Sequence, residues 1–346
     1  MNIFTRAIFT LSILTVISAS ARAQDNASVA DLIKQGTQLN DQGKFAEAIV
    51  KYNEALKLEP DNAQANYEMG FTLMASGKGN DGIPFAEKAL KGNVSAKFTA
   101  ACYDLLGTIY DQDHKAKKAI EAYQSGIKLM PDYQRLHYNL GIAYFRNKQY
   151  AEAESEAIEA IKLDPKHASS QRMYALVTFH QNKRVNALLG FCSFILLEPN
   201  TERSAEAYNN IQSILKGGVL KDNSGRATII ISPKGGQDNE VLNMSISMTT
   251  LAAQSKKLTG MDMLEFQLKH ILGVAGELSE KKTDKTFFDQ FFASYFYKLS
   301  QSTNMPAFVR LVSLSANKDE NAKWMNDNDA QVKALDNWVA TTERSF

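Results

Sequence analysis

Histidine and serine are side chains that commonly bind a metal ion or act in catalysis, and their spacing here indicates neither role. The five histidines are His114, His137, His167, His180 and His270. No two of them stand at the His-x-x-x-His spacing that puts two imidazoles on one helix face, so no zinc site is expected. The sequence also lacks the Gly-x-Ser-x-Gly elbow that presents a nucleophilic serine. We therefore expect no metal, no cofactor and no serine-based catalysis.

Two other groups of residues resemble ligand sites more closely. Lys234-Gly235-Gly236 is a glycine pair beside a lysine, but a phosphate loop needs the longer Gly-x-x-x-x-Gly-Lys pattern followed by a helix, so a turn is predicted. Met244, Met248, Met261 and Met263 form a methionine-rich stretch. Thioethers are soft ligands for Cu(I), but methionine also fills irregular cores, and the core role is the one we predict.

The balance of charges argues against one class of partner. The 346 residues include 39 basic and 38 acidic side chains, which give a formal net charge of +1. Binding to nucleic acid requires a basic surface that neutralises phosphates, so no nucleic acid partner is expected. The hydrophobic share of 44% and the charged share of 22% are typical of a soluble globular protein.

The first 23 residues have the pattern of a secretory signal peptide. Arg6 precedes an apolar run from Ala7 to Ile17, and the segment ends in Ala21-Arg22-Ala23. This run is too short to cross a bilayer, which takes about 20 apolar residues, and no later run could span one. The pattern predicts an exported protein, periplasmic or secreted, whose mature chain begins near Gln24 and has no membrane span.

Any site has to be positioned by the elements of the chain, and half of the chain is periodic. Small residues recur at intervals of 34, and prolines follow four of them by 24 residues. The small residues are Gly36 and Gly70, then Gly107, Gly141 and Ala175; the prolines are Pro60, Pro131, Pro165 and Pro199. This period is typical of a helix-turn-helix solenoid. We expect five repeats and a capping helix, within a domain of residues 24–216: 29–62, 63–99, 100–133, 134–167, 168–201 and 202–216.

The pattern resembles the tetratricopeptide repeat (TPR) family. The matching residues include Leu106-Gly107-x-x-Tyr110 followed by Ala119, Tyr123 and Pro131, and Leu140-Gly141-x-x-Tyr144 followed by Ala153, Ala160 and Pro165. The resemblance implies an α-solenoid that binds a peptide or helix along the face lined by the first helix of each repeat. Matched residue by residue, that face carries Tyr67, Phe71, Met74, Arg135, Tyr138, Phe145, Arg146, Arg172 and Phe179. Aromatic and arginine side chains dominate the binding energy at many interfaces.

Three features depart from the family pattern. In the first repeat Ile33 and Thr37 occupy positions where some members hold a partner's C-terminal carboxylate, so recognition of a chaperone tail is not implied. Repeat two has Gly82 in place of an alanine and Val94 in place of the proline, and its three extra residues are expected in a loop over residues 92–99. Repeat five has Ala175 in place of the glycine.

The two cysteines are expected to be buried and unpaired. Cys102 and Cys192 lie in the third and fifth repeats. Repeats in a solenoid touch mainly their neighbours, so a disulfide between these two residues would be strained or impossible.

Residues 217–346 are predicted to form a mainly helical module with at most one or two short strands. Ala227–Ile231 is β-branched and reads as a strand. Residues 241–255 fit both a strand and a helix pattern, and the continuation into Ala252-Ala253-Gln254 favours a helix. Four clearer helices are centred on apolar stripes at Leu264–Leu278, Phe287–Leu299, Phe308–Val312 and Val332–Val339, and Asp284 is the predicted N-cap of the second.

The aromatic stripe from Phe287 to Phe296 can be read in two ways. It could be a lipid-binding or partner-binding surface, but so many large apolar residues on one helix more often form a core. A core is therefore predicted.

These observations favour a non-catalytic interaction scaffold or adaptor of the cell envelope, whose partner is a protein. The alternative is an enzyme with its active site in the C-terminal module, where His270, Asp262 and Glu265 would be the titratable residues. The C-terminal module could also cover the first-helix face of the repeats, and the sequence leaves that question open.

Overall fold

The computed structural model describes residues 28–92, 94–217, 219–221, 227–229 and 237–346. The expected signal peptide (1–23), the predicted mature N-terminus and Lys234-Gly235-Gly236 lie outside these residues. Two compact units divide the chain after Lys118, and each is described by itself.

The first unit consists of helical hairpins. Its helices are α1 (Val29–Asp41), α2 (Phe45–Leu58), α3 (Ala63–Ala75), α4 (Gly79–Ala89) and α5 (Ala96–Gln112). Helix α1 packs on α2 and α3 packs on α4, as the repeat pattern predicts. Ser28 begins α1 in a capping box, because its hydroxyl accepts from the Asp31 N–H at 3.1 Å while its own N–H donates to the Asp31 carboxylate.

The predicted loop of repeat two is only partly a loop. Helix α4 ends at Ala89, but α5 already begins at Ala96, so residues 96–99 of the expected loop are helical. Ser95 makes this early start possible, because its hydroxyl accepts the Phe98 N–H at 3.2 Å. The extra residues therefore lengthen α5 at its N-terminus.

The second unit begins within α6 (Ala116–Leu129) and continues the hairpins. Helices α7 (Gln134–Arg146) and α8 (Tyr150–Leu163) pair, as do α9 (Ala168–His180) and α10 (Arg184–Leu197), and α11 (Glu202–Lys216) packs on α10. Repeat five has no glycine at Ala175, but Gly190 of α10 supplies the close contact instead. A Cβ atom built on Gly190 would lie 2.9 Å from the Cβ of Ala175. The glycine at this helix contact therefore lies on the second helix of the repeat and not on the first.

A buried polar side chain in the first helix of a repeat donates a hydrogen bond to the carbonyl of the proline that precedes that helix. Six residues after Pro131, His137 donates from Nε2 to the proline carbonyl at 2.8 Å. Six residues after Pro165, the Gln171 side chain donates to the Pro165 carbonyl at 2.6 Å. In the first unit Asn66 makes the same contact with the Pro60 carbonyl at 3.0 Å. Each proline lies two residues after the last residue of the preceding helix, so these bonds satisfy a carbonyl of the turn between the two helices.

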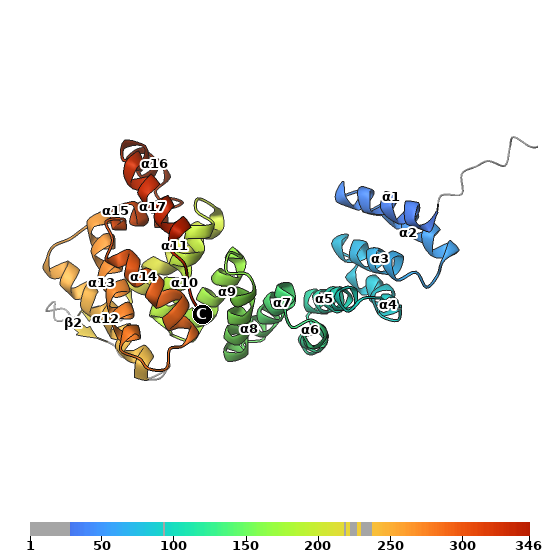
Figure 1. The fold of residues 1–346 in the computed structure, drawn as a ribbon, viewed down its shortest axis with the longest axis horizontal. Helices are drawn as coiled ribbons and strands as arrows, with labels where there is room; N and C mark the ends of the chain where they lie inside the picture. The colour runs from blue at the N-terminus through green and yellow to red at the C-terminus, as the bar shows by residue number, and fades with distance from the viewer. Residues whose placement is uncertain (1–27, 93, 218, 222–226, 230–236) are drawn as a thin grey trace, which may run out of the picture. The chain divides into compact units, whose positions relative to one another are not determined.

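Among its described residues, the C-terminal module is helical apart from one pair of short strands (Figure 1). Strands β1 (Val219–Lys221) and β2 (Ala227–Ile229) pair antiparallel, with Val219 opposite Ile229. The helices are α12 (Gln237–Ser255), α13 (Gly260–Glu280), a π-helix (Phe288–Ala293) running into α14 (Ser294–Ser300), α15 (Met305–Val312), α16 (Lys318–Asp327) and α17 (Asp329–Thr341). Residues 241–255 are therefore helical, and the strand predicted at Ala227–Ile231 is present at its first three residues.

Two details of the module differ from the sequence analysis. Asp284 is not the N-cap of the aromatic helix. Thr286 begins that helix, because its hydroxyl accepts the Asp289 N–H at 3.3 Å and its own N–H donates to the Asp289 carboxylate at 2.9 Å. Helix α16 was not anticipated, since its sequence is polar and its one buried residue is Asn321.

The aromatic stripe is core, as predicted, because Phe288, Phe291, Phe292, Tyr295 and Phe296 are all buried. Both cysteines are unpaired and buried, which confirms that prediction. Among the described helices, none combines the length and the hydropathy needed to cross a bilayer.

Candidate functional site

The first-helix face of the second unit is formed by α7 and α9. Helix α7 carries Arg135, Tyr138, Phe145 and Arg146, and α9 carries Arg172 and Phe179. Tyr138, Phe145, Arg172 and Phe179 are half-buried, whereas Arg135 and Arg146 are exposed. The predicted residues of this unit therefore all lie on first helices and all keep some solvent exposure.

Tyr138 lies at the junction of two repeats. Its ring meets that of His167, just before α9, edge to face at a centroid distance of 5.1 Å. His167 is in turn held by the side chains of Gln134 and Ser170. Burial lowers the pKa of His167, so its ring is neutral at physiological pH. Tyr138 therefore packs against an uncharged ring.

Phe145 belongs to an aromatic cluster that spans three helices. Its centroid lies 5.7 Å from that of Tyr150 and 5.2 Å from that of His180. Tyr150 and His180 stack at 5.2 Å with an angle of 13° between their planes, and Phe179 meets His180 edge to face. Phe145, Tyr150, Phe179 and His180 together are called the aromatic cluster below.

Phe145 and Phe179 are among the residues predicted for the first-helix face, whereas Tyr150 and His180 are not. Tyr150 is the first residue of α8, a second helix, and His180 is the last residue of α9. Both positions belong to the ends of helices rather than to the first-helix face. Only the packing of α8 on α9 brings them together.

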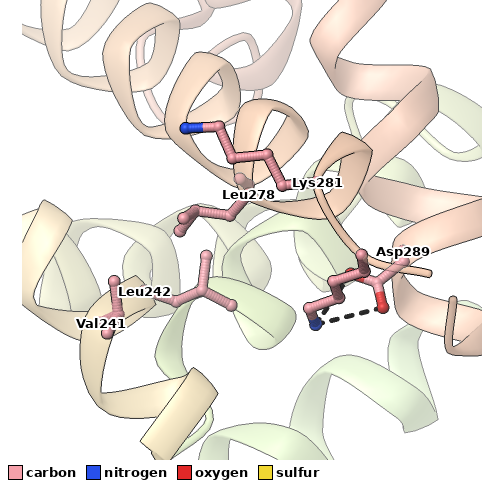
Figure 2. A pocket seen from close by; sticks show the side chains of 7 residues that line it. Val241, Leu242, Leu278, Lys281 and Asp289 are labelled. Atoms are coloured by element: carbon pink, nitrogen blue, oxygen red, sulfur yellow. Dashed lines mark hydrogen bonds and ion pairs between the residues drawn. The ribbon is translucent and has the colours of Figure 1, made fainter. Parts of the chain in front are cut away.

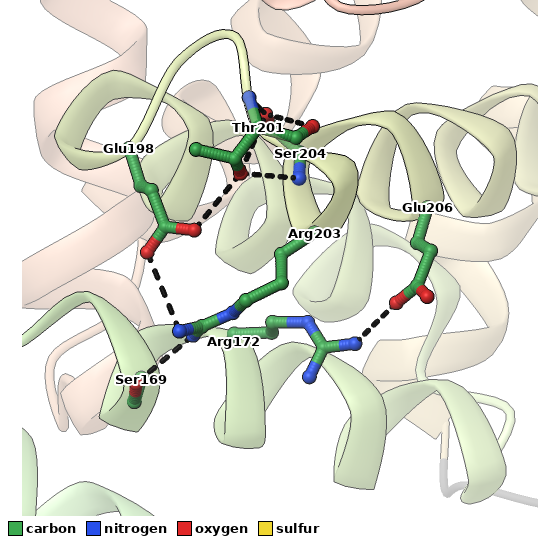
Figure 3. Close-up of polar contacts among 7 residues, drawn as sticks. All are labelled: Ser169, Arg172, Glu198, Thr201, Arg203, Ser204 and Glu206. Atoms are coloured by element: carbon green, nitrogen blue, oxygen red, sulfur yellow. Dashed lines mark hydrogen bonds and ion pairs between the residues drawn. The ribbon is translucent and has the colours of Figure 1, made fainter.

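The arginines between α9 and α11 are already engaged within the chain (Figure 3). Arg172 donates to the Glu206 carboxylate at 2.6 Å. Arg203 donates to the Ser169 hydroxyl at 2.9 Å and pairs with Glu198 at 3.4 Å. Helix α11 thus continues the face beyond α9, and a carboxylate of a partner would have to compete with Glu206 for Arg172.

The first unit carries the remaining predicted residues on α3. Tyr67, Phe71 and Met74 are half-buried. Tyr67 stacks on Phe71 with centroids 6.5 Å apart and meets Phe98 of α5 at 5.4 Å. Here too the aromatic residues of a first helix are grouped, and Phe98 is a member that is not among the predicted site residues.

The C-terminal module packs on other surfaces of the repeats. Helices α12, α13 and α15 and the π-helix contact α10, and α12 also contacts α11. From α9 the ring of Tyr174 faces this interface, where it stacks on Phe292 at 4.9 Å. The module thus packs mainly on α10, the second helix of the last repeat. The half-buried aromatic residues of α7 lie instead on the first helix of the α7–α8 hairpin.

The alternative catalytic residues all lie on α13. Asp262, Glu265 and His270 border an open surface depression. The His270 Nδ1 atom donates to the Phe266 carbonyl at 2.7 Å, and the His270 ring lies against the Phe266 ring at 4.0 Å. Burial raises the pKa of Glu265. No group of three His, Cys, Asp or Glu side chains suited to a metal ion occurs among the described residues.

Comparison with known proteins gives matches over the repeats. The family model described as "TPR repeat" matches residues 36–77 and 109–148, and the one described as "Tetratricopeptide repeat" matches residues 134–167. Human Tetratricopeptide repeat protein 6 is 27% identical over 135 residues, which cover 39% of this chain and 25% of that protein. The Hsp70-Hsp90 organizing protein of Triticum aestivum is 30% identical over 103 residues, which cover 30% of this chain and 17% of that protein. The chain thus spans a quarter or less of the length of these curated relatives.

Similar solved structures include Pseudomonas aeruginosa pilF and YrrB. For pilF the TM-score is 0.49 at 15% identity, covering 69% of this chain and 96% of that one. For YrrB, described as a TPR protein with an unusual peptide-binding site, the TM-score is 0.44 at 19% identity, covering 58% of this chain and 98% of that one.

Proposed function

Because the chain is a tetratricopeptide repeat protein, we propose that it is a non-catalytic scaffold that binds a segment of a partner protein on the first helices of its repeats. The observation that carries the proposal is the partial exposure of aromatic side chains on α7 and α9 while the C-terminal module packs on α10 and α11. The described part of the module packs mainly on α10 and α11, and we assign the partner to the first-helix face.

The composition of this face suits a protein segment. Tyr138 and Phe145 are seven residues apart, which is two turns of α7, so both point to the same side. Rings held by neighbouring rings lose little conformational freedom on binding, and aromatic residues are common anchors at interfaces. Exposed Arg135 and Arg146 at the two ends of α7 favour a segment that carries acidic residues.

Truncation of the anchors tests the proposal. The double variant Y138A/F145A should lose partner binding by about 2 kcal/mol or more, as interface anchors do. It should lose little stability, within about 1 kcal/mol per site, because partly exposed positions contribute less than core positions. The measurement is capture of partners by purified full-length protein, followed by titration of the captured protein.

The matched control is L163A, which truncates an exposed apolar side chain at the C-terminal end of α8. It should leave binding unchanged. Equal binding by wild type and Y138A/F145A would contradict the proposal, as would a loss of binding in both variants.

We also propose that the protein acts after export, in the periplasm or outside the cell. The support is the arrangement of Arg6, the apolar run 7–17 and Ala21-Arg22-Ala23. N-terminal sequencing of native protein should show a first residue at or near Gln24. Retention of Met1 would overturn this part of the proposal without affecting the binding face.

A further inference from the structure

A pocket of about 200 Å³ lies between α12 and α13 of the C-terminal module (Figure 2). The residues that line it are Val241 and Leu242 of α12, Ala275 and Leu278 of α13, and Lys281, Lys282 and Asp289 after α13. Figure 2 shows the Leu242 and Leu278 side chains facing each other from the two helices, with the Asp289 ion pair to one side. This space is called the α12–α13 pocket below.

The α12–α13 pocket is apolar and buried at its bottom and open at its rim. Leu242 is 5% exposed and Ala275 is 1% exposed, so these two side chains form a dry floor. Val241 is 48% exposed, although covering an apolar side chain of this size lowers the free energy. An apolar group that entered the pocket would contact the buried floor and cover Val241 at the same time.

Of the three charged side chains that line the pocket, one has no partner among the described residues. Lys282 forms an ion pair with Asp289 at 3.2 Å, and the Asp289 side chain is almost completely buried. Separating this pair would leave a buried carboxylate uncompensated, so a ligand is not expected to break it. Lys281 is exposed and forms no ion pair with any described residue. The lining therefore carries one uncompensated positive charge, on an exposed side chain.

This arrangement favours a ligand with an apolar part and one negative charge. The apolar part gains free energy by entering the space between the two leucines. The negative charge pairs with the Lys281 ammonium while both stay in contact with water, so neither charge has to be fully desolvated. A cation would be repelled by Lys281, and a small polar anion would gain nothing from the apolar floor.

We propose that the α12–α13 pocket binds a small alkyl carboxylate. The alkyl chain lies between Leu242 and Leu278, and the carboxylate lies beside the Lys281 ammonium. The volume suits a chain of about eight carbons, because a cavity of roughly 150 Å³ in a protein core holds benzene. This site is in the C-terminal module and is separate from the protein-binding face on α7 and α9.

Four probes separate the contribution of the charge from that of the chain. Octanoate has both groups, octanol lacks the charge, octylamine has the opposite charge, and acetate lacks the chain. Isothermal titration of purified full-length protein should show one site for octanoate. Octanol and octylamine should bind about fivefold or more weakly, as expected for the loss of one ion pair at an open rim, and acetate should show no saturable binding.

Three results of this titration would overturn the proposal. Equal affinities for octanoate and octanol would show that the charge is not recognised, and an absence of saturable octanoate binding would show that the pocket takes no alkyl chain. Tighter binding of an acetylated dipeptide that ends in leucine than of octanoate would assign the pocket to the C-terminus of a peptide instead.

Variants of Lys281 test the role of its charge. K281M keeps an unbranched side chain without the ammonium and should bind octanoate and octanol equally. K281E should reverse the preference, so that octylamine binds more tightly than octanoate. The matched control is K285M, because Lys285 is also an exposed lysine but does not line the pocket, and it should bind octanoate as wild type does. An unchanged preference for octanoate in K281M, or the same loss of preference in K285M, would contradict the assignment.

A variant of the floor tests the position of the chain. A275L fills the bottom of the pocket and should prevent binding of octanoate, while circular dichroism checks that the variant is folded. A folded A275L protein that bound octanoate as tightly as wild type would contradict the proposal. K281M and K281E change an exposed position, so they test the site even if A275L does not fold.

Discussion

At the scale of single residues, the contacts of His137 determine its charge. Nε2 faces the Pro131 carbonyl and Nδ1 lies 2.7 Å from the Glu156 carboxylate. Both partners can only accept, so both ring nitrogens need a proton. Burial disfavours the charged ring, but the bonds to Glu156 and Pro131 outweigh it and raise the pKa of His137.

This arrangement predicts a pH-dependent stability with a defined sign. Histidine in an unfolded chain titrates near about 6.5. Since the folded pKa is higher, the stabilisation is fully present below about pH 6.5 and is lost as the pH rises through the folded pKa. The loss is about 1.4 kcal/mol for each pH unit between the two pKa values.

Urea denaturation of wild type and H137Q across this range measures the effect. Glutamine is the matched control, because Gln171 makes the equivalent bond to Pro165 in the next repeat and does not titrate. The free energy of unfolding of wild type should fall relative to that of H137Q as the pH rises. Parallel profiles for the two proteins would show that the Glu156 contact does not charge the ring.

The two thiols give a second prediction at this scale. Burial raises the pKa of Cys102 to about 12 and that of Cys192 further still. Because the thiolate is the reactive form, neither residue should react with a thiol reagent at neutral pH while the protein is folded. Both should react within the mixing time in denaturant, and rapid labelling of the native protein would show that the repeats open more readily than their packing indicates.

At the scale of helices, the contact within each hairpin decides which small residue is tolerated. The sequence predicted these hairpins because the 34-residue period is carried by the residues at the contact. It could not predict how near the backbones approach. In repeat two a Cβ on Gly82 would lie 2.8 Å from the backbone oxygen of Gly70, whereas a Cβ on Gly141 would meet the flexible end of Met173 at 2.7 Å.

G82A should therefore destabilise the protein, although alanine is the residue that the family pattern favours at this position. Helix propensity alone would make alanine better by about 1 kcal/mol, but two backbones must move apart, and overpacking costs about 1–3 kcal/mol. The net loss expected is up to about 2 kcal/mol. G141A is the control and should change stability by less than about 1 kcal/mol, because Met173 can move aside. Far-ultraviolet circular dichroism in urea checks both, and a G82A protein as stable as wild type would mean that α3 and α4 have room to separate.

At the scale of the whole molecule, local patterns are least informative. The C-terminal helices follow from their apolar stripes, but nothing local indicates that the module packs on α10. The contact between Arg344 and Ser193 joins residues 151 positions apart. The aromatic cluster likewise depends on elements that meet only in the folded second unit. Sequence periodicity specifies neighbours in a solenoid, whereas docking of a module depends on surface complementarity.

Arg344 provides the test of that docking. After α17 ends at Thr341, the chain returns to α10, and the Arg344 guanidinium donates to the Ser193 hydroxyl at 2.5 Å. Its planar group also lies 3.9 Å from the ring centroid of Tyr295 and 4.8 Å from that of Phe291. Burial lowers the pKa of Arg344, yet a guanidinium stays charged in proteins, so the rings and the hydroxyl stabilise a cation removed from water.

R344A should loosen the module and lower the free energy of unfolding by about 2 kcal/mol, the value of a desolvated cation–π contact. R344K should recover only part of the loss, because an ammonium lacks the planar group that stacks on Tyr295. Both tryptophans, Trp324 and Trp338, lie in the module, so their fluorescence in urea follows this part of the chain. The exposed neighbour Glu343 gives the control E343A, which should match wild type. If R344A also matched wild type, the module would be held to the repeats by the Tyr174–Phe292 contact and its apolar surroundings alone.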